Sequence, residues 1–122
     1  MKYYTEEHQW VEVVGDEATV GITEYLADSL GEITGIELPD EYYDIIVAEH
    51  LGEIETEDDT VELIAPVTGT VTQINDQILD DIYLLLDSPE DKGWLCKLEN
   101  IDQYELDDLM TEDEYARYIE TL

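Results

Sequence analysis

Basic residues are nearly absent from this sequence of 122 residues. Four lysines and arginines stand against 34 aspartates and glutamates, which gives a formal net charge of −30 at pH 7. A surface this negative repels nucleic-acid phosphates and anionic lipid headgroups, so nucleic acid and membranes are not expected as partners. Basic proteins and cations are the complementary partners. A high-salt cytoplasm is one explanation of the charge.

Cysteine and long apolar runs are also scarce. Cys96 is the single cysteine, so no internal disulfide can form, which fits a reducing compartment. No apolar run approaches the length of a membrane span, and the first stretch, MKYYTEEHQW, lacks the apolar core of a signal peptide. We therefore expect a soluble, cytoplasmic protein.

Hydrophobic residues are abundant enough for a folded core. They make up 43% of the chain, whereas disordered chains combine high charge with low hydrophobicity. A length of 122 residues suits one domain and is short for two. We expect a single domain over residues 1–122 and a monomer.

Most of the chain favours short strands separated by glycine, proline and acidic turns. Alternating apolar residues and turn signals predict strands over residues 4–14, 18–22, 31–39, 45–47, 52–56, 60–64, 70–74 and 93–98. Without any further information, such a pattern is typical of an all-β barrel or sandwich.

Helices are predicted at the margins of this pattern. Thr23 can cap a short helix over residues 24–30. Thr111 and Glu114 have the spacing of a capping box before a final amphipathic helix, which would bury Tyr115, Tyr118 and Ile119. Residues 78–86 are predicted to form either a short helix or an irregular apolar packing loop.

The stretch from Leu51 to Val71 predicts a tight hairpin with acidic residues at its tip. Two extended runs flank Glu57, Asp58 and Asp59. The pattern G-x-I-E-T-x-x-x-x-x-x-L-x-x-P-V-T-G-x-V resembles the swinging-arm hairpin of the glycine cleavage system H protein family, which belongs to the lipoyl and biotinyl carrier proteins.

The resemblance extends over nearly all of the chain. Family members begin Y-T-x-x-H-E-W-V and continue G-x-x-A-T-V-G-I-T, and Tyr4, His8, Trp10 and Val11 match the first pattern. Later matches are G-W-L from Gly93 and L-x-x-L-M-x-x-x-x-Y in the tail. The resemblance implies a mainly β, lipoyl-domain-like fold: a flattened β-barrel or hybrid sandwich of two small antiparallel sheets, with small helices and a C-terminal helix.

Among the positions that depart from the family, two bear on the turn geometry and on the function. Its turn after the E-L-P strand usually contains glycine, whereas this chain has Tyr42 and Tyr43 there, which puts the usual turn geometry in question. The family's tip lysine, which carries the lipoyl group through an amide, falls on Asp58 when the flanking residues are counted without a gap. A carboxylate cannot replace that amine, so we expect Asp58 to be unmodified and the chain to carry no lipoyl cofactor.

The family also implies a function without catalysis, because its H protein shuttles an arm among the glycine decarboxylase, the aminomethyl transferase and a dihydrolipoyl dehydrogenase. We expect a non-lipoylated paralogue, not an enzyme, that docks on glycine cleavage or lipoate-transfer enzymes. Its partner-binding residues would be Glu55, Glu57, Asp58 and Asp59 at the hairpin tip. The alternative is an acidic scaffold that binds a basic protein or divalent cations.

No metal site or catalytic group is expected. The acidic tip lacks the spacing and the glycine of an EF-hand loop, so a solvated face explains it better. His8 and His50 have no CxxC or HxxxH partners. Cys96 on a predicted strand is typical of core packing, although a Cys/His nucleophile pair stays open.

Overall fold

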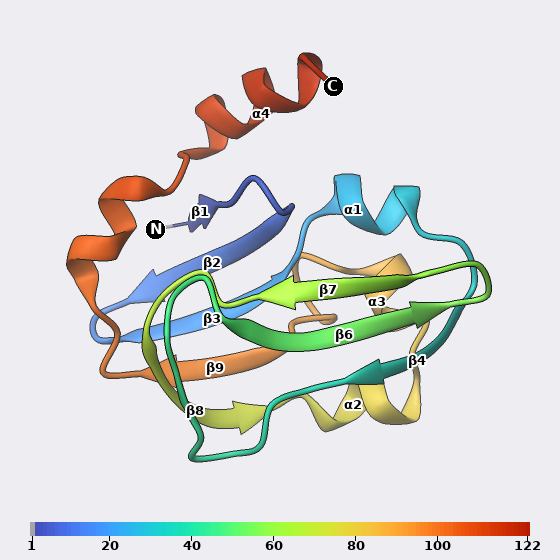
Figure 1. Cartoon of the computed structure of the whole chain (residues 1–122), viewed down its shortest axis with the longest axis horizontal. Helices are drawn as coiled ribbons and strands as arrows, with labels where there is room; N and C mark the ends of the chain where they lie inside the picture. The colour runs from blue at the N-terminus through green and yellow to red at the C-terminus, as the bar shows by residue number, and fades with distance from the viewer. Residues whose placement is uncertain (1) are drawn as a thin grey trace.

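The computed structural model describes residues 2–122, which form two antiparallel β-sheets (Figure 1). One sheet has six strands in the order β1-β2-β3-β9-β8-β5, and the other has three in the order β4-β6-β7. The strands are β1 (Lys2–Tyr4), β2 (Gln9–Val14), β3 (Glu17–Ile22), β4 (Ile33–Glu37), β5 (Asp44–Ile45), β6 (His50–Thr56), β7 (Thr60–Ile64), β8 (Gly69–Ile74) and β9 (Cys96–Glu99).

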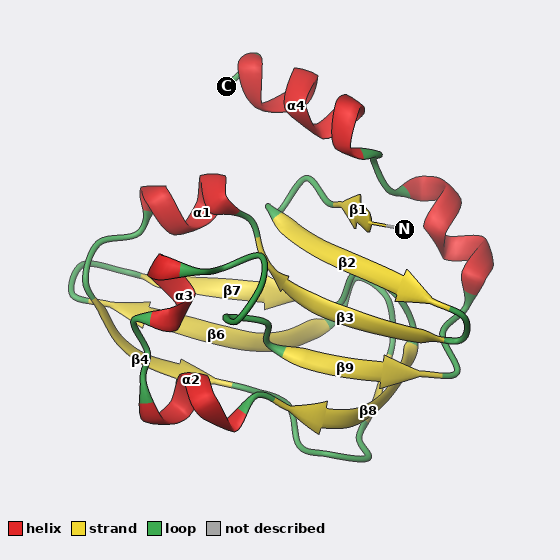
Figure 2. Ribbon diagram, turned by 180° about the vertical axis from the view of Figure 1, so that it is seen from behind, coloured by secondary structure: helices red, strands yellow, loops and turns green. Residues whose placement is uncertain are grey.

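Short helices lie around the sheets, as Figure 2 shows from behind. They are α1 (Glu24–Ser29), α2 (Asp76–Asp80), α3 (Leu84–Asp87), a 3-10 helix (Gln103–Asp108) and α4 (Glu112–Glu120). The open question about residues 78–86 is therefore answered by two short helices, α2 and α3. Among residues 2–122, no helix is long and apolar enough to cross a membrane.

Apolar side chains from both sheets meet in one core. Val11, Val20 and Leu98 of the six-stranded sheet are fully buried, and so is Ile54 of the three-stranded sheet. Burial of these alternating strand residues accounts for the two-layer arrangement. The mainly β fold with two antiparallel sheets, small helices and a C-terminal helix, expected from the sequence, is confirmed.

The expected first strand over residues 4–14 is wrong, because the chain turns in the middle of it. Strand β1 ends at Tyr4 and β2 begins at Gln9, and Tyr4 pairs with Trp10. The turn between them closes through the Thr5 N–H to the Gln9 carbonyl at 2.9 Å, and His8 adopts a left-handed φ of 64°. Polar residues Glu6 and Glu7 lie exposed in this turn, and the alternating pattern does not reveal it.

The expected strand over residues 45–47 is also shorter than predicted. Strand β5 ends at Ile45, which is buried, whereas Ile46 and Val47 are 53% and 36% exposed. The N–H of Val47 donates to the Thr68 hydroxyl, and Ala48 at a φ of 70° turns the chain away from the sheet. A hydrogen bond to the side chain of a residue distant in the sequence thus takes the place of the next ladder bond.

Tyr42 takes over the turn where the family has glycine. Its φ is 66°, its side chain is 77% exposed, and its N–H donates to the Val71 carbonyl at 2.6 Å. Tyr42 therefore adopts a left-handed backbone conformation, in which a Cβ is unfavourable.

Replacing Tyr42 with glycine should stabilise the protein. Removal of the left-handed strain outweighs the extra flexibility of the unfolded chain, so we expect Tyr42→Gly to raise the free energy of unfolding by about 0.5–1 kcal/mol. Urea denaturation measures it. Tyr43→Gly is the matched control and should lower the free energy of unfolding. Stabilisation by both variants, or by neither, contradicts the strain argument.

The C-terminal helix covers the outer side of β1. Thr111 and Glu114 form the predicted capping box, so this prediction is confirmed. Tyr115 is buried and its ring stacks on that of Tyr4 with centroids 4.7 Å apart, while Tyr118 and Ile119 are half-buried against the same cluster. Tyr4 and Met110 also exchange two backbone hydrogen bonds, which hold the chain before α4 against β1.

The side chain of Gln9 links the two sheets. It is 1% exposed, its Nε2 donates to the Ile64 carbonyl at 2.6 Å, and its Oε1 accepts from the Ile64 N–H at 2.8 Å. The Gln9 amide thus makes the two hydrogen bonds to Ile64 that a neighbouring strand would otherwise make at the end of β7. A glutamate could make only one of the two bonds while ionised.

Gln9→Glu should destabilise the fold. The substitution buries a carboxylate and leaves the Ile64 carbonyl without its donor, so we expect the free energy of unfolding to fall by about 2–4 kcal/mol at neutral pH. Urea denaturation measures it, with exposed Gln73→Glu as the control for added charge, which should change it by less than about 0.5 kcal/mol. Equal effects of the two variants would show that charge alone is responsible.

Candidate functional site: the β6–β7 hairpin tip

The tip of the β6–β7 hairpin is a tight turn closed by backbone and side-chain bonds. Strands β6 and β7 pair up to Glu55 and Thr60. The Thr56 N–H donates to the Asp59 carbonyl at 2.8 Å, and the Thr56 hydroxyl accepts from the Asp59 N–H at 3.1 Å. The tip also touches the body of the protein, because the Glu57 N–H donates to the Glu32 carbonyl at 3.3 Å.

All four acidic residues expected to bind partners lie at this tip and are exposed. They are Glu55, Glu57, Asp58 and Asp59. Asp59 uses one carboxylate oxygen to accept from the Thr60 N–H at 2.8 Å, which is the ordinary turn role of aspartate. Asp58 stands at the apex between them. The hairpin therefore presents negative charge to solvent and has no enclosed site for chemistry.

An amide-linked arm does not fit the residues at this tip. Asp58 has no amine, and the lysines of the chain, Lys2, Lys92 and Lys97, all lie outside β6 and β7. Lys2 forms an ion pair with Glu90 at 3.0 Å, and the Lys97 ammonium lies 5.0 Å from the centre of the Trp94 ring. Neither contact orients a lysine towards the hairpin.

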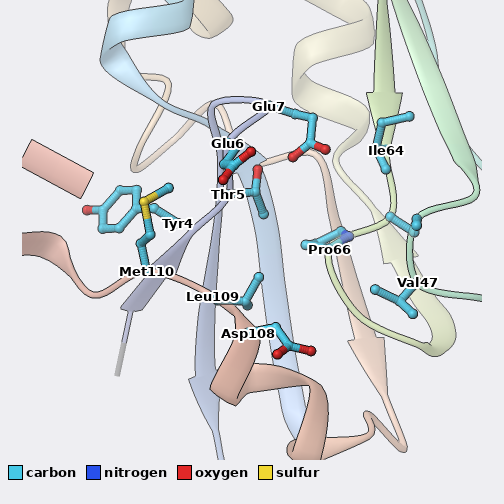
Figure 3. A pocket seen from close by; sticks show the side chains of 12 residues that line it. Tyr4, Thr5, Glu6, Glu7, Val47, Ile64, Pro66, Asp108, Leu109 and Met110 are labelled. Carbon is cyan, nitrogen blue, oxygen red and sulfur yellow. The ribbon is translucent and has the colours of Figure 1, made fainter. Parts of the chain in front are cut away.

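A pocket of about 230 Å³ opens at the base of β7 (Figure 3). Its apolar wall includes Val47, Ile64 and Pro66, and acidic Glu6 and Glu7 lie on the facing turn. Four segments far apart in the sequence build it, so no sequence pattern predicts it. The nearest sequence signal is Gln9, which departs from the H-E-W-V pattern and fixes Ile64 in the pocket wall.

The candidate catalytic and metal residues are not brought together. Cys96 is fully buried, and burial raises the pKa of its thiol to about 12, which keeps it from acting as a thiolate. His8 bonds to the Tyr115 hydroxyl at 2.9 Å, while His50 lies 3.9 Å from Glu62. Within residues 2–122, no three histidine, cysteine, aspartate or glutamate side chains group as metal ligands.

A family model described as Glycine cleavage H-protein matches residues 2–122. The chain belongs to the glycine cleavage H-protein family. It is 41% identical to the glycine cleavage system H protein of Staphylococcus carnosus, over 95% of this chain and 92% of that protein. It is 37% identical to the glycine cleavage system H protein 4 of Aquifex aeolicus, over 99% of this chain and 71% of that protein.

A solved structure has the same fold. The crystal structure of a glycine cleavage system H protein from Mycobacterium marinum superposes with a TM-score of 0.85 at 28% identity, over 96% of this chain and 94% of that one. H-protein family members are lipoyl carriers within the glycine cleavage system rather than its catalysts, which agrees with the absence of enzyme activity expected from the sequence.

The expectation that the chain carries no cofactor is wrong at the level of the family. The H-protein family is the lipoate-bearing one, and relatives across nearly the whole chain are named as glycine cleavage H proteins. Lipoyl is therefore the cofactor that the family implies. The hairpin adds one fact about this chain: residue 58 is an aspartate, so that position offers no amine for the attachment of a lipoyl group.

His8 gives the fold a measurable pH dependence. Burial lowers the pKa of His8, and the nearby Glu7 carboxylate opposes this only in part. The unfolded state then binds more protons than the folded state below the ordinary value of 6.5, so stability falls as the pH drops through that value.

The variant His8→Asn isolates this effect. Asparagine tolerates the left-handed φ, and its side-chain amide has both a donor and an acceptor for the Tyr115 hydroxyl, but it does not titrate. Between pH 7 and pH 5, we expect wild type to lose unfolding free energy relative to the variant in parallel urea denaturations. If the unfolding free energies of wild type and variant change equally between pH 7 and pH 5, His8 titrates alike in the folded and unfolded states.

Proposed function

We propose that this chain is a protein-binding member of the H-protein family, which docks on glycine cleavage or lipoate-transfer enzymes through the face that carries the β6–β7 hairpin. In this proposal, Asp58 occupies the lysine position and stays unmodified. The protein acts in the cytoplasm as a monomeric single domain.

The observation that carries the proposal is the combination of an intact hairpin with an acidic apex. The turn is closed by Thr56 and Asp59, its strands pair in full up to Glu55 and Thr60, and Asp58 is exposed where a docking enzyme would meet it. An enzyme that recognises the shape of the hairpin would therefore still find that shape. A folded hairpin that presents an acidic apex is what supports this proposal.

Restoring the lysine tests this proposal. Wild type and Asp58→Lys are each co-expressed with a lipoate ligase or lipoyl transferase and analysed by intact mass. We expect Asp58→Lys to gain one lipoyl group at residue 58, because the flanking turn is already folded. Glu57→Lys is the matched control: it makes the same charge change one residue earlier, away from the apex, and should stay unmodified.

Two outcomes contradict the proposal. A lipoyl group on wild type, located by peptide mapping on Lys2, Lys92 or Lys97, would show a different attachment site. An unmodified Asp58→Lys variant that is folded by circular dichroism would show that lipoylating enzymes do not dock on this hairpin.

Binding of wild type to the glycine cleavage enzymes is then measured at low and high salt, since shape-driven docking should survive screening.

A further inference from the structure

A groove of about 560 Å³ is lined by residues of α4 and α1. Both helices lie on the side of the molecule where α4 covers β1 (Figures 1 and 2). The residues of α4 that line it recur at intervals of three and four, so they lie on one face of the helix. They are Glu112, Tyr115, Ala116 and Ile119. Ala116 is exposed and Ile119 is half-buried, so this side of the groove is apolar and accessible.

The opposite wall is formed by α1. Glu24 and Asp28 are four residues apart, so both carboxylates project from the same face, and Tyr25 lies between them with 39% of its surface exposed. The Tyr25 ring is held in place by the imidazole of His8, with centroids 4.6 Å apart. The groove thus combines an ordered aromatic ring with two carboxylates.

The groove has no cation of its own. Of the described residues that line it, none is lysine or arginine. Glu90 at its end is already satisfied, because it pairs with Lys2 at 3.0 Å and accepts from the Glu24 N–H at 2.9 Å. Burial, and after it the carboxylates of Glu90 and Glu112, raise the pKa of Tyr4 in the groove floor.

We propose that this groove binds an arginine-containing segment of a basic partner protein. A guanidinium is planar and carries several donors in a fixed fork, so it can stack on the Tyr25 ring while it pairs with Glu24 and Asp28. Its methylene stem matches the apolar side formed by Ala116 and Ile119. The surface is separate from the acidic hairpin tip and does not depend on what residue 58 carries.

The negative charge of the chain and of the groove argues against other occupants of the groove. A second copy of this chain also carries −30 and would place carboxylates against carboxylates. Acidic peptides and nucleic acids are repelled in the same way. A compact divalent ion would need several oxygen ligands around one point, and no such group is found among residues 2–122. A cation with an apolar stem matches the lining of the groove, which combines carboxylates with apolar side chains.

The test is an NMR titration of the whole ¹⁵N-labelled chain with a short peptide, capped at both ends, that contains two arginines and two leucines. Its partner peptide replaces the arginines with lysines, and both are used at about 0.15 M salt to screen diffuse attraction. We expect the amide shifts to concentrate on α1 and α4 and the arginine peptide to bind more tightly. Shifts spread evenly over the acidic surface, or equal affinity for the two peptides, overturn the proposal.

Two double variants give a matched comparison. Glu24→Gln with Asp28→Asn removes two charges from the groove, and Glu57→Gln with Asp58→Asn removes the same two charges from the hairpin tip. We expect the groove variant to weaken arginine-peptide binding about fivefold or more and the tip variant to change it less than about twofold. Equal losses would show that net charge alone attracts the peptide. Thermal melts of both variants confirm that each remains folded.

Discussion

Apolar packing between the two sheets holds together a chain whose surface charges repel one another. The core consists of uncharged side chains from both layers, such as Val11, Val20, Ile54 and Leu98, and the acidic residues remain outside it. Self-repulsion of a net charge of −30 opposes this compact state. The polar contacts that do reach inside are neutral, as in the paired bonds between Gln9 and Ile64, so they add cohesion without burying a charge.

Much of the fold could be predicted because its signals are local. The hairpin around Asp58, the Thr23 cap and the Thr111–Glu114 capping box each depend on residues within a few positions of one another. The errors arose where a distant contact decided the backbone. The break before Gln9 follows the pairing of Tyr4 with Trp10 and Met110, and the end of β5 follows the hydrogen bond from Val47 to Thr68.

The surfaces described above also divide into one that the sequence predicts and two that it does not. The position of Asp58 at an exposed apex is a property of one hairpin, so residue spacing was sufficient to place it. The pocket beside Ile64 and the groove between α1 and α4 are each built by segments that meet only in three dimensions. Their charges are visible in the sequence, but acidic residues occur throughout this chain, and composition cannot show which of them share a surface.

Tyr115 links helix α4 to the segment around β1. Its hydroxyl lies 2.8 Å from the Thr23 hydroxyl and 2.9 Å from His8, and its ring covers Tyr4, so β1 obtains its outer covering from a helix that comes far later in the sequence. During synthesis, Tyr4 and Trp10 therefore lack this covering until α4 has left the ribosome. A chain interrupted before α4 would expose the aromatic rings of Tyr4 and Trp10, which are the kind of apolar surface that chaperones and proteases recognise.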